Sequence, residues 1–143
     1  MLLDANLLIC STNRANPYYA LANRLMDELM SGDRRVGIPW QTIGAFVRIT
    51  THPRATAHPL TGDQAWGLVD SWLAAPPAWI PPATETTARV YGDLTSQIPI
   101  TGNLVPDAML AALAIEHGLE LWSADTDFAR FPGLRWLNPL SVT

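Results

Sequence analysis

The chain has 143 residues, of which 48% are hydrophobic and 15% are charged. This composition excludes a disordered chain, and the length fits one globular domain, residues 1–143. The formal net charge is −4 and all nine basic residues are arginines, so overall charge alone does not favour nucleic-acid binding.

In the first half of the chain, apolar spacing predicts two strands, at residues 2–4 and 36–39. Two helices follow the first strand, at residues 7–11 and 17–30, and two follow the second, at residues 41–51 and 61–73. Asn16 and Pro17 favour the start of the second helix as cap and first helical residue. Thr61 and Gln64 have the spacing of a capping box. We expect all six tryptophans, Trp66 among them, to lie in the core.

The second half is expected to begin with a short strand at residues 79–80 and a helix at residues 84–97. Pro106 is expected to start a further helix at residues 107–117, which Gly118 ends. A buried strand, a short helix and an edge strand follow, at residues 119–122, 125–130 and 135–137. Strands separated by helices predict an α/β fold: a small central parallel sheet of four to five strands flanked by helices.

The sequence also bears on the cellular compartment. No stretch approaches the ~18 uninterrupted apolar residues of a membrane span, and the first residues lack the basic region of a secretion signal. Cys10 is the only cysteine and cannot form an internal disulfide. We therefore expect a cytoplasmic protein.

Aspartates fall at three predicted junctions between strand and helix: Asp4, Asp107, and the pair Asp125 and Asp127. In a parallel sheet the carboxyl ends of the strands share one edge, where ligands bind. Ionised carboxylates gathered there repel one another, and an all-oxygen cluster selects a hard cation such as Mg²⁺ or Mn²⁺. Two such ions would offset the net charge of −4 and leave the arginines for phosphate contacts.

Each of these residues also has an ordinary structural interpretation. An aspartate at a helix start is commonly a cap or a solvated charge. Asn6 and Ser123 are either hydrogen-bond partners of the acids or turn residues. The three histidines, His52, His58 and His117, are expected to be structural or exposed rather than catalytic.

Four segments together give the chain a family resemblance. It resembles PIN-domain ribonucleases, and specifically the VapC toxins of type II toxin–antitoxin pairs, over nearly its full length. The segments are Leu2-Leu3-Asp4-Ala5-Asn6, the middle motif from Phe46 to Arg54, the helix start Pro106-Asp107-Ala108, and the stretch from Ser123 to Phe131 that holds Asp125 and Asp127.

The resemblance implies a metal-dependent endoribonuclease that cleaves structured RNA, transfer or ribosomal RNA, through metal-activated water. It implies Asp4, Asp107 and Asp125 as catalytic metal ligands, with Asp127 supporting a second or outer site. The expected ion is Mg²⁺, for which Mn²⁺ can substitute. The expected partners are the RNA substrate, a VapB-type antitoxin and a second copy of the chain.

The resemblance gives supporting roles to further polar residues. Ser123 and Asn6 match polar positions beside the acids. Arg48 and Arg54 either grip RNA phosphate or reach an acidic partner, and Arg48 has a structural ion pair as a further alternative.

One departure from the family pattern concerns the middle motif. Many PIN domains have a glutamate where this chain has Ala45, and Glu116 is about 13 Å along the helix from Asp107. The site therefore has at most four aspartates, which hold one metal ion or two, with Gln41 or water filling the gap. We expect weak Mg²⁺ binding in the absence of RNA.

Three other classes of protein compete with the nuclease. A phosphatase or receiver domain would need a lysine near the phosphate, and the chain has none. A catalytically weakened PIN-fold module, which binds RNA or a protein without cleavage, would agree with Ala45. A purely structural α/β domain would use Asp107 only as a helix cap.

Overall fold

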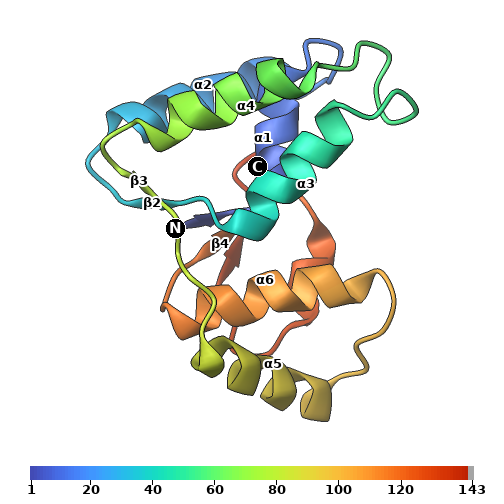
Figure 1. Cartoon of the computed structure of the whole chain (residues 1–143). Coiled ribbons are helices and arrows are strands. Elements are labelled where there is room, and N and C mark those ends of the chain that lie inside the picture. Colours follow the sequence, from blue (N-terminus) through green and yellow to red (C-terminus); the bar gives the residue numbers. More distant parts are fainter. Residues whose placement is uncertain (142–143) are drawn as a thin grey trace.

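The structure, a computed structural model, describes residues 1–141. Within them, five strands form one sheet: β1 (Leu2–Leu3), β2 (Val36–Gly37), β3 (Ala78–Trp79), β4 (Leu121–Trp122) and β5 (Trp136–Leu137). The helices are α1 (Ala5–Thr12), α2 (Tyr19–Ser31), α3 (Trp40–Thr50), α4 (Gly62–Leu73), α5 (Glu85–Gln97), α6 (Leu104–Glu116) and a 3₁₀ helix, η1 (Thr126–Arg130) (Figure 1). None of these helices is long and apolar enough to cross a membrane.

The sheet has the order β3-β2-β1-β4-β5, and every neighbouring pair is parallel. This confirms the predicted α/β class. The strand β1 lies at the centre, with Leu2 opposite Gly37 of β2 and Leu121 of β4. Beyond the last paired residues, the amide of Asp4 donates to the carbonyl oxygen of Trp122 at 3.0 Å. The segments that follow β1 and β4 therefore start side by side.

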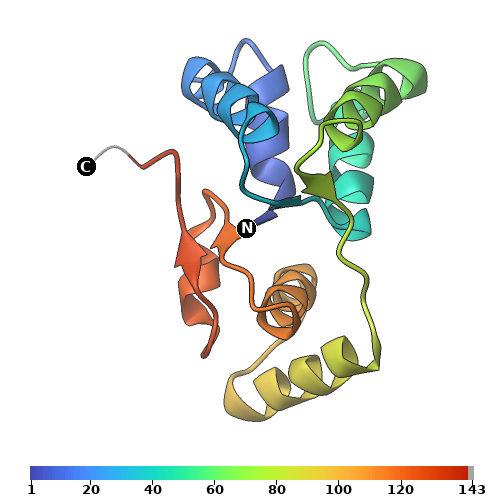
Figure 2. The ribbon, with the colours of Figure 1, turned by 90° about the vertical axis from the view of Figure 1, so that its left-hand side faces the viewer.

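The sheet separates two hydrophobic clusters. Leu2 and Leu3 are both fully buried, and because successive residues of a strand face opposite sides, they belong to different clusters. The cluster around Leu3 includes Leu7 and Phe46 and lies under α1 to α4, whereas the cluster around Leu2 lies under α5 and α6. Figure 2 shows the two helical layers on opposite sides of the strands.

Three helix starts differ from the prediction by two residues or more. The helix α1 begins at Ala5, two residues early, because the Asp4 side chain caps it. The helix α6 begins at Leu104, three residues early, because Pro106 in the first turn loses no hydrogen bond that this turn would make. Asp107 therefore lies on the first turn and does not open the helix. The helix α2 begins only at Tyr19, because the Asn16 side chain accepts from the amide of Tyr18 at 2.8 Å and holds a turn. The capping box at Thr61 is confirmed.

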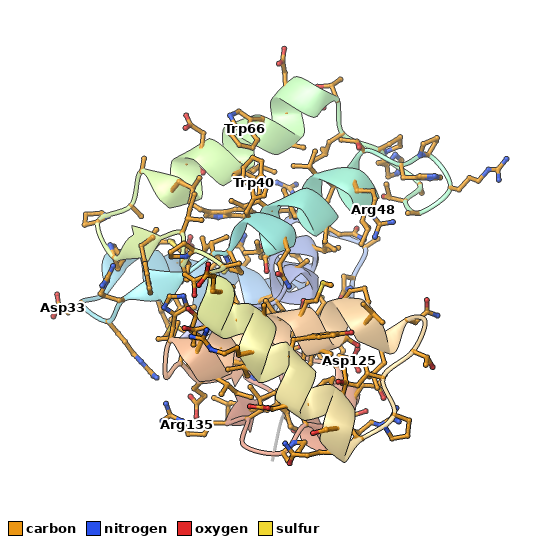
Figure 3. The ribbon with its side chains drawn as sticks, turned by 60° about the horizontal axis from the view of Figure 1, so that its bottom comes forward. Asp33, Trp40, Arg48, Trp66, Asp125 and Arg135 are labelled. Carbon is orange, nitrogen blue, oxygen red and sulfur yellow. The ribbon has the colours of Figure 1, made fainter. Side chains whose placement is uncertain are left out.

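The prediction that all six tryptophans lie in the core was wrong, because Trp40 and Trp66 are exposed and the other four are only partly buried. Trp66 is 44% exposed and Trp40 is 66% exposed, and their rings meet edge to face with centroids 6.4 Å apart (Figure 3). The helix α4 buries Ala65 and Val69, and the residue after Ala65 points about 100° away from that face. Tryptophan content alone does not say which face a helix turns inward.

Candidate functional site

Asp4 holds the junction between β1 and α1. Its side chain caps α1 by accepting from the amide of Ala5 at 2.7 Å, and its other oxygen accepts from the Ser123 hydroxyl at 2.7 Å. Burial raises the pKa of Asp4, the two hydrogen bonds oppose that rise, and the charge of Asp125 adds to it. The carboxylate is thus fixed in place by two donors from different elements.

Ser123 is fully buried and connects the polar residues of this edge. Its hydroxyl donates to Asp4 and accepts from the Asn6 amide group and from the backbone N–H of Asp125, both at 3.0 Å. The Asn6 oxygen accepts from the amide of Ala124 at 3.4 Å. Of the two interpretations left open for Asn6 and Ser123, the structure therefore has both residues as hydrogen-bond partners within the acidic edge.

Three further aspartates converge beside Asp4. Asp107, Asp125 and Asp127 each offer a carboxylate oxygen within 4.8 Å of the others. Asp107 projects from the first turn of α6, and Asp125 caps η1 by accepting from the amide of Asp127 at 2.9 Å. Asp107 and Asp125 are half-buried and Asp127 is exposed. Asp4 is not a member of this group of three.

The electrostatics link all four carboxylates. The pKa of Asp107 is raised to about 6, first by burial and then by the charges of Asp125, Asp4 and Asp127. Each nearby negative charge disfavours ionisation of the next, and within residues 1–141 none of the four aspartates forms an ion pair. The cluster therefore has an uncompensated negative charge.

This donor set fits a hard divalent cation. All the candidate ligands are carboxylate oxygens, and they converge where burial and then mutual repulsion raise the pKa of Asp107. Glu116, near the other end of α6, accepts hydrogen bonds from Thr84 and Thr87 instead. Of the four aspartates predicted from the sequence, the structure brings Asp107, Asp125 and Asp127 together, and Asp4 lies beside them.

Arg48 lies on the last turn of α3 and is exposed. Among residues 1–141 it forms no ion pair, so the structural pair considered for it is not observed in the described part of the chain. Figure 3 places Arg48 and Asp125 on the same side of the molecule and Arg135 on the other side. Arg48, His52 and Arg54 line a pocket of about 260 Å³.

Two residues that support this edge were not predicted from the sequence. The buried Thr42 hydroxyl donates to the carbonyl oxygen of Leu3 at 2.8 Å, which ties α3 to the residue before Asp4. The indole N–H of Trp136 donates to the carbonyl oxygen of Ser123 at 3.0 Å. Neither contact has a local sequence pattern, because each joins residues from separate elements.

Comparison with known proteins agrees with the geometry. The family model described as PIN domain matches residues 1–134. Ribonuclease VapC37 of Mycobacterium tuberculosis is 38% identical over 138 residues, which cover 96% of both chains. Ribonuclease VapC43 of the same species is 34% identical, covering 96% of this chain and 94% of the relative.

Solved structures share the fold. VapBC-1 from nontypeable Haemophilus influenzae superposes with a TM-score of 0.67 at 17% identity, covering 98% of both chains. VapC20 of Mycobacterium tuberculosis, described as a Sarcin-Ricin loop cleaving toxin, gives a TM-score of 0.63 at 17% identity, covering 94% of this chain and 98% of that one. The chain therefore belongs to the PIN-domain family, and its relatives there are VapC ribonucleases.

Proposed function

We propose that the protein is a Mg²⁺-dependent endoribonuclease and the toxin of a type II toxin–antitoxin pair. The observation that carries this proposal is the convergence of Asp107, Asp125 and Asp127 within 4.8 Å at the carboxyl edge of the sheet, beside Asp4. The names of the relatives, Ribonuclease VapC37 and Ribonuclease VapC43, support the activity.

In this proposal Asp4, Asp107 and Asp125 hold Mg²⁺, for which Mn²⁺ can substitute, and Asp127 supports a second or outer site. A divalent ion bound there supplies activation of water for attack on the phosphodiester and offsets charge on the phosphate and the leaving oxygen. The four carboxylates come from three segments, which follow β1, begin α6 and follow β4.

The single proton of the Ser123 hydroxyl fixes the direction of the three hydrogen bonds that this hydroxyl makes. That proton goes to Asp4, so the other partners of the hydroxyl must be donors, and the Asn6 amide group and the Asp125 N–H are donors. Asp4 accepts from both of its partners, which favours the ionised carboxylate that a cation needs. Ser123 and Asn6 thus act as positioning residues.

An RNA substrate must bring phosphates close to an acidic cluster, which requires cations nearby. In this proposal Arg48 and Arg54 supply these cations: Figure 3 places Arg48 on the same side of the molecule as Asp125, and the pocket that Arg48, His52 and Arg54 line contains no carboxylate. The adjoining pocket, of about 300 Å³, adds Arg14 and His58, again with no carboxylate among its lining residues. Structured RNA, transfer or ribosomal, is the proposed substrate, in agreement with the description of VapC20 as a Sarcin-Ricin loop cleaving toxin.

The proposed protein partners are a VapB-type antitoxin and a second copy of the chain. Support for the antitoxin comes from VapBC-1 of Haemophilus influenzae, whose fold this chain shares. Support for self-association comes from the exposed pair Trp40 and Trp66, since large exposed aromatic side chains that pack together are typical of interaction surfaces. A cytoplasmic location remains a prediction.

A second candidate function rests on Ala45. This position of α3 has no carboxylate, so a PIN-fold module that binds RNA or a protein without cleaving is the alternative. Metal affinity would then be too low for turnover, although RNA would still bind near Arg48 and Arg54.

Cleavage of total cellular RNA by the purified protein, with Mg²⁺ and with EDTA, separates the two candidates. The matched variants are Asp107→Asn and, as a control on the exposed surface of α4, Asp70→Asn. The nuclease predicts discrete fragments that require Mg²⁺, that vanish in the first variant and that persist in the second. RNA binding without fragments, from a folded protein free of antitoxin, would favour the binding module.

A further inference from the structure

A second charged pocket lies at the opposite edge of the sheet from the acidic cluster. Arg34 and Arg35 precede β2 and Arg135 precedes β5, so in a parallel sheet these residues gather at the amino ends of the strands. Together they line a pocket of about 380 Å³ that also includes Trp79, His117 and Glu120. Figure 3 shows Arg135 and Asp125 on opposite sides of the molecule.

The pocket is cationic within a chain of net charge −4. Three arginines face one carboxylate, that of Glu120. The nearest pair between them joins Arg34 and Glu120 at 3.7 Å, with side chains 60% and 30% exposed, so solvent screens it strongly. Glu120 also accepts from the indole N–H of Trp122 at 2.8 Å. The excess positive charge is therefore left for a ligand.

The guanidinium groups keep most of their donors free. Among residues 1–141, Arg35 forms no side-chain hydrogen bond or ion pair, and Arg135 uses one nitrogen, which donates to the carbonyl oxygen of Gly118 at 2.6 Å. A guanidinium has five N–H donors in a planar fork that matches the oxygens of a phosphate. The pocket thus offers many donors and few acceptors.

Aromatic rings hold two of these guanidinium groups in place. The Arg35 guanidinium lies 4.2 Å from the centroid of the Trp79 ring, and that of Arg34 lies 5.5 Å from the Trp122 ring. The Trp79 ring meets His117 edge to face at 5.7 Å, and the His117 ring nitrogen is 2.8 Å from the carbonyl oxygen of Pro82. Donors fixed in advance lose less freedom when a ligand binds.

We propose that this pocket at the amino edge binds a phosphate group and is a site separate from the acidic cluster. A phosphate has several acceptor oxygens and no need of an acceptor from the protein, which suits three arginines beside one carboxylate. The phosphate comes either from a small free ligand or from the end of a nucleic-acid strand. Neither source requires the acidic cluster or its metal.

Isothermal titration of the full chain in EDTA, at physiological ionic strength, tests the proposal. The probes are inorganic pyrophosphate and a short DNA strand with either a 5′-phosphate or a 5′-hydroxyl. DNA is used because it lacks the 2′-hydroxyl through which an RNA strand can be cleaved. We expect Arg35→Gln and Arg135→Gln each to weaken phosphate binding about tenfold. Arg24→Gln, the same charge change on the exposed surface of α2, should leave it unchanged.

Glu120→Gln gives a test in the opposite direction. It removes the single carboxylate of the pocket but keeps an acceptor for the Trp122 indole, so it should tighten binding. Thermal melting of each variant verifies that it is folded.

Pyrophosphate binding that depends on Arg35 and Arg135 supports a free phosphate ligand, and binding of only the 5′-phosphorylated strand supports a nucleic-acid end. Absence of binding, or equal weakening by Arg24→Gln, overturns the proposal. A carboxylate-rich peptide that binds through these arginines while both phosphate probes fail would overturn it too.

Discussion

The Ser123 hydroxyl donates to Asp4 across 119 positions of sequence at 2.7 Å. The same oxygen accepts from Asn6 and from the amide of Asp125, so one atom joins the loops that follow β1 and β4. Asp4 and Asp125 therefore keep their relative positions through a single buried side chain.

Ser123→Ala should weaken both the fold and the site. It removes the donor to Asp4 and the acceptor for two N–H groups, which predicts a loss of about 1–3 kcal/mol in the free energy of unfolding. Mg²⁺ affinity should fall in parallel, because Asp4 is no longer held. Denaturant melting and Mg²⁺ titration measure the two effects. Ser71→Ala, on the exposed surface of α4, is the control, and equal behaviour of the two variants would contradict the role of Ser123.

Metal binding should depend on pH near the pKa of Asp107, about 6. This pKa lies above the ordinary aspartate value of 3.8, so the folded protein favours the protonated form between these two values. In the metal-free protein, ionised Asp107 destabilises the fold. This destabilisation is lost, and the free energy of unfolding rises, as the pH falls from 7 through about 6 toward 3.8.

The affinity for Mg²⁺ changes in the other direction, because the ion needs the ionised carboxylate. It should drop as the pH falls through about 6. Titrations of Mg²⁺ above and below this pH measure the change, with Asp107→Asn as the variant in which the step should be reduced. An affinity that stays constant across this range would contradict the arrangement of the cluster.

Ala45→Glu should strengthen metal binding. The position is half-buried on α3, three residues after Thr42, which bonds to the residue before Asp4. We expect weak binding of Mg²⁺ by the natural chain and about tenfold tighter binding by the variant, since one more carboxylate ligand is worth roughly 1.4 kcal/mol or more. Calorimetry measures both.

Gly44→Glu is the matched control for Ala45→Glu, because it adds the same charge at an exposed neighbour where a side chain meets open space. Equal gains in the two variants would mean that general electrostatic attraction, rather than a ligand on α3, is responsible. Submicromolar Mg²⁺ affinity of the natural chain would refute the expectation of weak binding.

Arg48→Gln and Arg54→Gln should weaken RNA binding with little effect on metal affinity. Removing one phosphate-binding arginine reduces the slope of log affinity against log salt by about 1, because fewer counterions are released when the RNA binds. Filter binding of catalytically inactive Asp107→Asn protein over a range of salt concentrations measures this slope. Arg89→Gln, on the exposed surface of α5, is the control and should leave the slope unchanged. If Arg48→Gln also leaves the slope unchanged, Arg48 contacts a protein partner and not RNA.

The sequence was sufficient for the order of elements and for the edge at which the acids meet. Alternating apolar segments and the helix-ending Gly118 have local causes, and parallel topology places Asp4 and Asp125 together. The start of α6 was not predictable, because a proline is accepted anywhere in a first turn. The exposure of Trp66 depended on which face α4 packs, which is a tertiary property.

The separation of Asp4 from the other three aspartates was also beyond the sequence. The oxygens of Asp4 accept from Ala5 and from Ser123, a residue far away in the chain, and they are not among those that lie within 4.8 Å of one another. The cationic pocket is a similar case, because Arg35 and Arg135 lie just before two different strands, Trp79 lies in a third, and no short motif joins them.

The acidic edge of the sheet lies between the two hydrophobic clusters. Asp4 follows Leu3, which packs with α1 to α4, whereas Asp107 projects from α6, which packs on the other side of the sheet. A ligand that binds both aspartates therefore spans the boundary between two halves of the molecule. Such a ligand would hold the two halves together and oppose their separation. The amides of α5 and α6 should therefore exchange hydrogen more slowly as a larger fraction of the sites is filled.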